Sequence, residues 1–385
     1  MSESIRSLYY VTNRRHVGED RWRPDGYGTR MSDDGQDNLR FGRLSVSVGS
    51  RARKDINRAL SDNRNVDGKV LVDRFEKLVR KKAEIEAYPE AIDPELPERM
   101  QANLVLGSKA MFADLHREMS GCERDVVVFI HGYAVSWEAA CASALAFQES
   151  FSAYEGEHAE REPPLVVLFT WPSNGSKLPY TAYRSDRTDA RGSGSAIARA
   201  FLKLRDFLLQ ITTHDHGELE PCGRDIHLIC HSMGNFVLQH ALVAPEHEIS
   251  RLGRKLFDHV FLVAADVDDD VLEPGGGLDG LTRIASSIGV YHNADDRALV
   301  ASNKTKGNPE RLGQHGASRP DLVHRKVYHV DCKGTATDFG RHSYFTGGLA
   351  NLDIRDTIVG VPFEDRAYRA RHATHHRSWR LNPAG

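Results

Sequence analysis

The sequence predicts an α/β fold in which helices cover both faces of a mostly parallel central sheet. From about residue 124, short continuous apolar runs alternate with segments that carry apolar residues at helical spacing. An apolar run without polar alternation is typical of a strand buried on both faces. A serine on a sharp turn between one such run and a helix-like stretch is the third observation, and it favours the same fold class.

The first third of the chain is expected to extend and flank this sheet. Residues 1–50 carry two β-like stretches, at 8–12 (LYYVT) and 41–48 (FGRLSVSV), which we expect to join the sheet as antiparallel edge strands. Residues 51–123 are charged and helix-prone, and a proline-rich link at 88–97 divides them. We expect a helical insertion packed beside the core, and the alternative is a lid or a partner-docking element.

Residues 124–360 are expected to form the α/β core. Its predicted strands are the apolar runs at 125–130, 165–170, 225–229, 258–264, 288–292 and 326–330. Helices are predicted over 137–151 and 197–211, where apolar side chains share one face. The C-terminal tail, residues 361–385, is basic and aromatic. We expect it to be solvated and poorly ordered, and binding of an anionic partner is the alternative.

The clearest functional motif is CHSMG at residues 230–234, directly after a buried run and directly before a helix-like stretch. A serine on a tight strand-to-helix turn is the arrangement called a nucleophile elbow, and its usual pattern is G-x-S-x-G. Here Cys230 replaces the first glycine with another small residue. Ser232 is therefore the predicted nucleophile, and we expect His231 to pack under the turn rather than to act as the base.

A serine nucleophile of this kind also needs an oxyanion hole, built partly on an earlier strand. The run at 125–130 ends in His131, Gly132 and Tyr133, and the glycine allows the backbone to approach a substrate closely. We expect the amide of Tyr133 to pair with that of Met233, the residue after the serine. Such fixed donors stabilise a developing oxyanion.

The acid and the base must follow the nucleophile in the chain. Asp296 comes just after the predicted strand at 288–292, and we favour it as the triad acid over its neighbour Asp295. Asp266 also follows a predicted strand and is the alternative acid. His342 lies in a loop beyond the last core strand and is the predicted base. The order serine, aspartate, histidine is thus satisfied.

Eight ordered blocks between about residues 124 and 346 resemble those of a largely bacterial α/β-hydrolase family, whose domain was long catalogued as of unknown function. The blocks are FIHGY at 129–133, TWPSNG at 170–175, YRSDR at 183–187, HSMGN at 231–235, ADVD at 265–268, DRAL at 296–299, RLG at 311–313 and HSYF at 342–345. The resemblance implies the α/β-hydrolase fold and the roles given above for Ser232, Asp296 and His342, with the same two amides as oxyanion donors. The chain departs from the family at Cys230, usually alanine or glycine, and at 264–266, commonly Ala-Pro-Asp.

Substrate contacts are expected from two places. In a hydrolase the connection after residue 171 overhangs the mouth of the site, so Tyr183 is a candidate pocket wall, and a structural network around Asp186 and Arg187 is the alternative reading of this segment. The backbone loop of His131 and Gly132 is the second place. We therefore expect His131, Gly132 and Tyr183 to contact the substrate.

Composition restricts the compartment and the partners. No stretch of the 385 residues approaches the roughly 20 apolar residues of a membrane span, and the N-terminus lacks an apolar signal core. Five cysteines without metal-type spacing indicate reduced thiols, so we expect a cytoplasmic protein. The net charge of −3 gives no bulk attraction to nucleic acid. The oligomeric state stays open.

Two ligand-like motifs are discounted. GGGLDG at 275–280 matches a dinucleotide-binding pattern but follows Glu273-Pro274 instead of a strand. The aspartates at 266, 268 and 270 resemble the start of a calcium loop, yet Val271 and Gly277 occupy positions that require glycine and glutamate. We therefore expect no metal and no organic cofactor.

The expected reaction is two-step acyl transfer on a small-molecule carboxylic ester, through an acyl-enzyme on Ser232. An ester is favoured because alcohols leave more easily than amines. A non-catalytic binding protein with the α/β-hydrolase fold is the alternative from another class, and a peptidase or acyltransferase is the alternative within catalysis. The intact serine, aspartate and histidine favour an enzyme.

Overall fold

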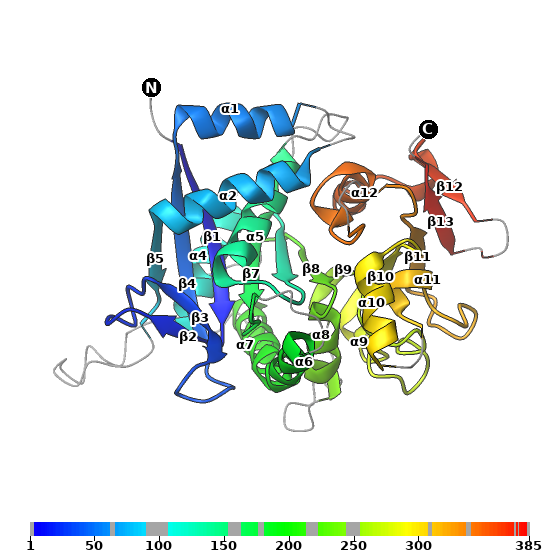
Figure 1. The fold of residues 1–385 in the computed structure, drawn as a ribbon, viewed down its shortest axis with the longest axis horizontal. Coiled ribbons are helices and arrows are strands. Elements are labelled where there is room, and N and C mark those ends of the chain that lie inside the picture. Colours follow the sequence, from blue (N-terminus) through cyan, green and yellow to red (C-terminus); the bar gives the residue numbers. More distant parts are fainter. Residues whose placement is uncertain are drawn as a thin grey trace.

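The computed structural model describes residues 4–61, 66–89, 107–152, 163–175, 181–212, 222–243, 255–306, 310–335, 340–372, 375 and 377–382. Within these residues an eleven-stranded sheet runs in the order β12-β13-β11-β10-β9-β8-β6-β7-β1-β4-β5. Its strands are β1 (Ser4–Thr12), β4 (Arg40–Val48), β5 (Ala83–Ala87), β6 (Val126–Ile130), β7 (Leu165–Thr170), β8 (Ile226–His231), β9 (Phe257–Val263), β10 (Ala285–His292), β11 (Val327–Asp331), β12 (Arg369–Arg371) and β13 (Ser378–Leu381). The N-terminal strands, in blue, and the C-terminal strands, in red, lie at opposite ends of this sheet (Figure 1).

Every neighbouring pair from β1 across to β13 is parallel, and the outer pairs β1–β4, β4–β5 and β12–β13 are antiparallel. The strands β7 and β8 are buried along their whole length, as their continuous apolar runs require. All of the predicted core strands are present. The predicted α/β fold with a mostly parallel sheet is therefore confirmed.

The N-terminal strands join the sheet through β1, which pairs antiparallel with β4 and parallel with β7. The connection between β1 and β4 forms a separate ribbon of β2 (Arg14–Val17) and β3 (Gly26–Met31), which the sequence did not predict. Tyr27 of this ribbon packs on Trp137, with ring centroids 4.6 Å apart. The ribbon does not pair with the main sheet and is held against it by side chains, since Tyr27 also packs on Tyr10 of β1, with ring centroids 5.4 Å apart.

Helices cover both faces of the sheet. One face is packed by α1 (Ser50–Ala59), α2 (Gly68–Lys82), α5 (Trp137–Ser152) and α12 (Gly348–Ile358). The other is packed by α4 (Gly107–Cys122), α7 (Gly194–Thr212) and α8 (Gly234–Val243). Further helices of the described residues connect these elements. They are α6 (Thr181–Gly192), α9 (Leu281–Ile284), α10 (Arg297–Lys306) and α11 (Leu312–His315), with the short 3-10 turns η2 (Tyr344–Thr346) and η3 (Phe363–Asp365).

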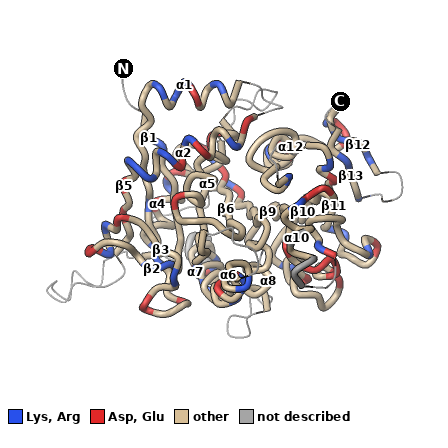
Figure 2. Tube along the Cα trace, viewed as in Figure 1, with Lys and Arg blue, Asp and Glu red and all other residues tan. Residues whose placement is uncertain are grey.

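Residues 51–123, expected as one insertion beside the core, are divided between the two faces. The helices α1 and α2 bury apolar side chains on one face, α4 does so on the other, and β5 extends the sheet. Charged residues of both signs lie along α1 and α2 (Figure 2). Each helix is amphipathic, so burying its apolar stripe against the sheet is favourable. Most of the proline-rich link, residues 90–97, lies outside the described residues.

The C-terminal segment is the main correction to the predicted organisation. A solvated tail is the wrong description for β12 and β13, because β13 pairs with β11 and β12 pairs with β13. Two of its basic side chains are buried in the fold, where Arg366 and Arg369 lie 2.9 and 3.1 Å from the same carboxylate oxygen of buried Asp353. No helix among the described residues is long and apolar enough to cross a membrane.

Candidate functional site

Ser232 occupies a strained turn between β8 and α8. Its φ is +53°, a left-handed conformation that non-glycine residues rarely adopt and that costs on the order of 1–3 kcal/mol. The surrounding backbone holds the turn: the amide of Ser232 donates to Val263 O (2.9 Å), and the amide of Asp266 donates to Ser232 O (3.2 Å). A Cβ at Gly234 would lie 2.6 Å from Ile130 O, so this position requires glycine. The turn is thus fixed by its neighbours.

The loop after β6 lies directly against Ser232. A Cβ at Gly132 would approach the Cβ of Ser232 to 2.7 Å, so only glycine permits this contact. On the other side of the serine, the amide of Met233 donates no hydrogen bond to any described residue. The two segments expected to supply oxyanion donors therefore meet at the serine.

His342 and Asp296 are joined by a hydrogen bond. The Nδ1 of His342 lies 2.6 Å from Oδ2 of Asp296, whose side chain is completely buried. The other carboxylate oxygen, Oδ1, accepts the amides of Ala298 and Leu299 at 3.0 Å each. These two amide donors fix the orientation of the carboxylate. The buried carboxylate therefore lies against the Nδ1 side of the histidine ring and fixes its orientation.

The loop that carries His342 lies over the elbow. The Nε2 of His231 is 3.2 Å from the backbone oxygen of His342, and the two rings are 4.7 Å apart. His231 also packs on Phe345 at 4.7 Å. Burial, and then the charge of His342, hold the pKa of His231 well below its usual range, so this ring is neutral. The structure thus brings the predicted base next to the residue that precedes the serine.

Asp266, the alternative acid, belongs to a different network. Its Oδ2 accepts the hydroxyl of Tyr183 at 2.6 Å, and its Oδ1 accepts the hydroxyl of Ser302 at 2.9 Å. The buried guanidinium of Arg311 places its Nε 3.4 Å from Oδ1. Burial, and then the charge of Asp266, raise the pKa of Tyr183, so the phenol stays protonated as a donor.

The predicted substrate-contacting residues separate into two groups. Gly132 lies beside the serine, and the ring of Tyr183 meets that of Tyr133 with centroids 5.4 Å apart. His131 instead lies beneath the loop, with only 1 % of its surface exposed and its ring stacked on Trp171 at 5.2 Å. Burial and the charge of Arg14 lower the pKa of His131 to about 3, so its ring is neutral. Its side chain supports the loop from below.

Arg14 and Asp186 hold the loop after β6 in place. The sequence did not identify either residue as a positioning group. Buried Arg14 donates from Nη2 to Val135 O (2.9 Å) and from Nε to Thr170 Oγ1 (2.8 Å). Buried Asp186 accepts the amides of Ala134 (3.1 Å) and Asn174 (2.9 Å). The sequence indicates Asp186 only as part of a local network with Arg187. No local pattern marks Arg14, because Val135 and Thr170 are more than 100 residues away in the chain.

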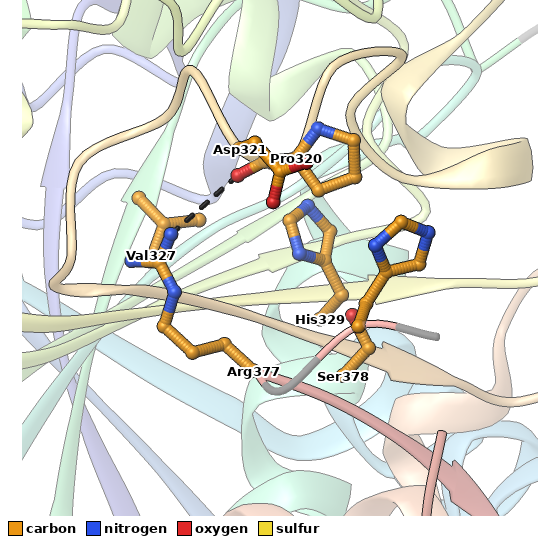
Figure 3. A pocket seen from close by; sticks show the side chains of 7 residues that line it. Pro320, Asp321, Val327, His329, Arg377 and Ser378 are labelled. Carbon is orange, nitrogen blue, oxygen red and sulfur yellow. Dashed lines mark hydrogen bonds between the residues drawn. The ribbon is translucent and has the colours of Figure 1, made fainter. Parts of the chain in front are cut away.

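A shallow pocket lies elsewhere, at the edge formed by β11 and β13. Its lining consists of Pro320, Asp321, Val327, His329, His375, Arg377 and Ser378 (Figure 3). Arg377 donates to the backbone oxygens of His324 (2.8 Å) and Pro320 (3.5 Å). These hydrogen bonds hold the segment before β13 against the loop before β11. None of the predicted site residues lines it. The candidate site therefore rests on the elbow and on the groups around it.

Comparison with known proteins gives one family. A family model described as an alpha/beta hydrolase of unknown function (DUF900) matches residues 108–347, more than half of the chain. The matched range includes Ser232, Asp296, His342 and the loop after β6. No curated protein matches this chain.

Proposed function

The chain belongs to this family of α/β hydrolases of unknown function, and from that premise we propose that it is a serine hydrolase that cleaves carboxylic esters. The observation that carries the proposal is the 2.6 Å hydrogen bond between His342 Nδ1 and the buried carboxylate of Asp296, in a loop that lies over the elbow of Ser232. A carboxylate, an imidazole and a serine on a strained turn are the parts of a nucleophilic triad.

The proposed first step is acylation. Nε2 of His342 removes the proton of Ser232 as Oγ attacks the carbonyl carbon of the ester. The negative charge that develops on the carbonyl oxygen is stabilised by the amides of Met233 and Tyr133. Asp296 keeps Nδ1 protonated and stabilises the imidazolium that forms, and His342 then returns the proton to the departing alcohol.

The proposed second step is hydrolysis of the acyl-enzyme. Neutral His342 removes a proton from water, which attacks the acyl carbon, and the imidazolium then protonates Ser232 Oγ as it leaves. Every proton is carried by one histidine, so the chemistry needs no metal. An ester is preferred over an amide because an alkoxide is a better leaving group than an amine anion.

Steady-state kinetics with a short p-nitrophenyl ester test the proposal. The full chain should hydrolyse the ester, and Ser232→Ala should lower kcat by a factor of about 10⁴ or more, as for other triad serines. The matched control is Ser286→Ala, at an exposed position in β10. Equal loss in both variants, or substantial activity in Ser232→Ala, would contradict the assignment.

A further inference from the structure

Three side chains of types that bind metal ions meet where β8 and β9 begin, whereas Ser232 lies where β8 ends. His227 lies near the start of β8 and His259 near the start of β9, and the register that pairs Leu228 with Val260 makes these histidines cross-strand neighbours. Their rings stack with centroids 5.3 Å apart. Together with Asp258 they present ligand atoms that all lie within 4.8 Å of one another. His227 lies five positions before Ser232, which corresponds to roughly 16 Å along a strand.

His227 is buried without the partners that a histidine needs. Only 1 % of its side chain is exposed, and neither ring nitrogen has a hydrogen-bond partner. The Nδ1 of His259 is likewise buried without one. A neutral imidazole carries one N–H donor and one lone pair, and leaving both unsatisfied in the interior is unfavourable. A bound cation would use the lone pair.

The distances around the two rings suit a tetrahedral site. The Nε2 of His259 lies 3.1 Å from Oδ2 of Asp258, and the Nε2 of His227 lies 3.8 Å from Oδ2 of Asp125. Zinc bonds of about 2.0–2.2 Å place neighbouring ligand atoms of a tetrahedron roughly 3.3–3.6 Å apart. The first distance lies just below that range and the second just above it. Asp125 is not one of the three residues whose ligand atoms lie within 4.8 Å of one another, so its carboxylate has to rotate toward them to become the fourth ligand.

The second oxygen of each carboxylate is already occupied. Oδ1 of Asp125 accepts the amide of Asp225 at 3.0 Å, and Oδ1 of Asp258 accepts Nζ of Lys255 at 2.6 Å. Outer contacts of this kind orient metal-binding carboxylates. They leave the Oδ2 atoms, the ones nearest to the histidines, as the available ligands.

We propose that His227, His259, Asp258 and Asp125 form a structural Zn²⁺ site that ties β6, β8 and β9 together. Two imidazole nitrogens favour zinc over magnesium or calcium, which prefer all-oxygen ligands. Four protein ligands would close the coordination sphere, so the ion supports the fold and takes no part in ester cleavage. Zinc enters from the side of Asp258 and His259, whose side chains are 24 % and 21 % exposed.

Calorimetric titration of the chelator-treated full chain with ZnCl₂ tests the site. We expect one ion per chain with micromolar or tighter affinity, a higher melting temperature in its presence, and the visible absorption of a tetrahedral centre when Co²⁺ replaces zinc. Asp258→Asn, at a partly exposed position, should weaken binding about 10- to 100-fold without unfolding the chain, and His227→Gln should do so at the buried position.

Two control variants distinguish this site from other histidine pairs. His372 and His375 stack at 5.6 Å, and His231 and His342 lie 4.7 Å apart beside Ser232. The double variant His372→Ala/His375→Ala and the single variant His342→Ala should both retain zinc binding. The proposal is overturned if the wild-type chain binds no zinc, or if Asp258→Asn binds as tightly as wild type while one of the controls loses binding.

Discussion

The loops after the neighbouring strands β9 and β10 each carry a buried aspartate, but they surround it differently. Asp296 accepts two backbone amides and the ring of His342. Asp266 accepts two hydroxyl groups and lies against the buried guanidinium of Arg311. The first environment orients the imidazole of His342, and the second places the carboxylate against the positive charge of Arg311. Position after a strand therefore does not define the role of a carboxylate, whereas its partners do.

The largest expected effect comes from Asp296→Asn. The amide can still accept the two backbone N–H groups, but it cannot hold His342 in the tautomer that removes a proton from serine. We expect kcat for a short p-nitrophenyl ester to fall by a factor of about 10⁴ with little change in melting temperature. Retained activity in a folded variant would contradict the role of Asp296 as the triad acid, which is the property that distinguishes it from Asp266.

Asp266→Asn should show the opposite pattern. Removing this charge leaves Arg311, of which only 2 % is exposed, paired with the exposed carboxylate of Asp268. We expect the free energy of unfolding to fall by roughly 3 kcal/mol, measured by denaturant titration, with kcat reduced less than about tenfold. Asp33→Asn is the control, because that exposed ion pair should contribute under about 1 kcal/mol. Loss of activity without loss of stability would make Asp266 the acid.

Gly132→Ala tests the packing of the loop after β6 on Ser232. The added Cβ would lie 2.7 Å from the Cβ of Ser232, so the loop must move and an oxyanion donor is displaced. We expect kcat to fall roughly 100-fold, the lower end for loss of one donor. In the control, Gly121→Ala in α4, the new Cβ meets nothing within 4 Å, and activity should be unchanged.

Tyr183→Phe should have the smallest effect and sharpens the description of the Asp266 network. The variant keeps the ring against Tyr133 but removes the hydroxyl that donates to Asp266. We expect a loss of about 1–2 kcal/mol in the free energy of unfolding, measured by denaturant titration, and a KM close to that of wild type. A large rise in KM with unchanged stability would instead make this hydroxyl a direct substrate contact.

Much of the fold could be predicted because burial on both faces leaves a clear signal in the chain. Strands such as β7 (LVVLFT) are continuous apolar runs, and they were found with nearly correct ends. The short strand β5 (AEIEA) and the helix α6 were not predicted. The strand β5 has only five residues, two of them glutamates, and α6 is mostly polar and buries Asp186 through contacts to distant loops. Their structure depends on tertiary partners and not on local pattern.

The candidate site was less predictable than the fold. The sequence located Ser232 by its turn, since a strained strand-to-helix turn has a recognisable pattern. It favours Asp296 as the acid but keeps Asp266 as an alternative, because both follow buried runs. The groups that distinguish them, Arg311 and His342, lie about 45 residues further along the chain in each case. The topology of the sheet brings each aspartate to its partner, so no short sequence pattern predicts these pairs.

Labelling with a fluorophosphonate, followed by mass spectrometry of the modified peptide, tests the central claim most directly. The probe reacts with an activated serine and needs no knowledge of the natural ester. The account predicts one adduct, on Ser232, with labelling strongly slowed in Asp296→Asn and little changed in Asp266→Asn. An adduct on another serine, or equal labelling rates in the wild type and Asp296→Asn, would contradict it.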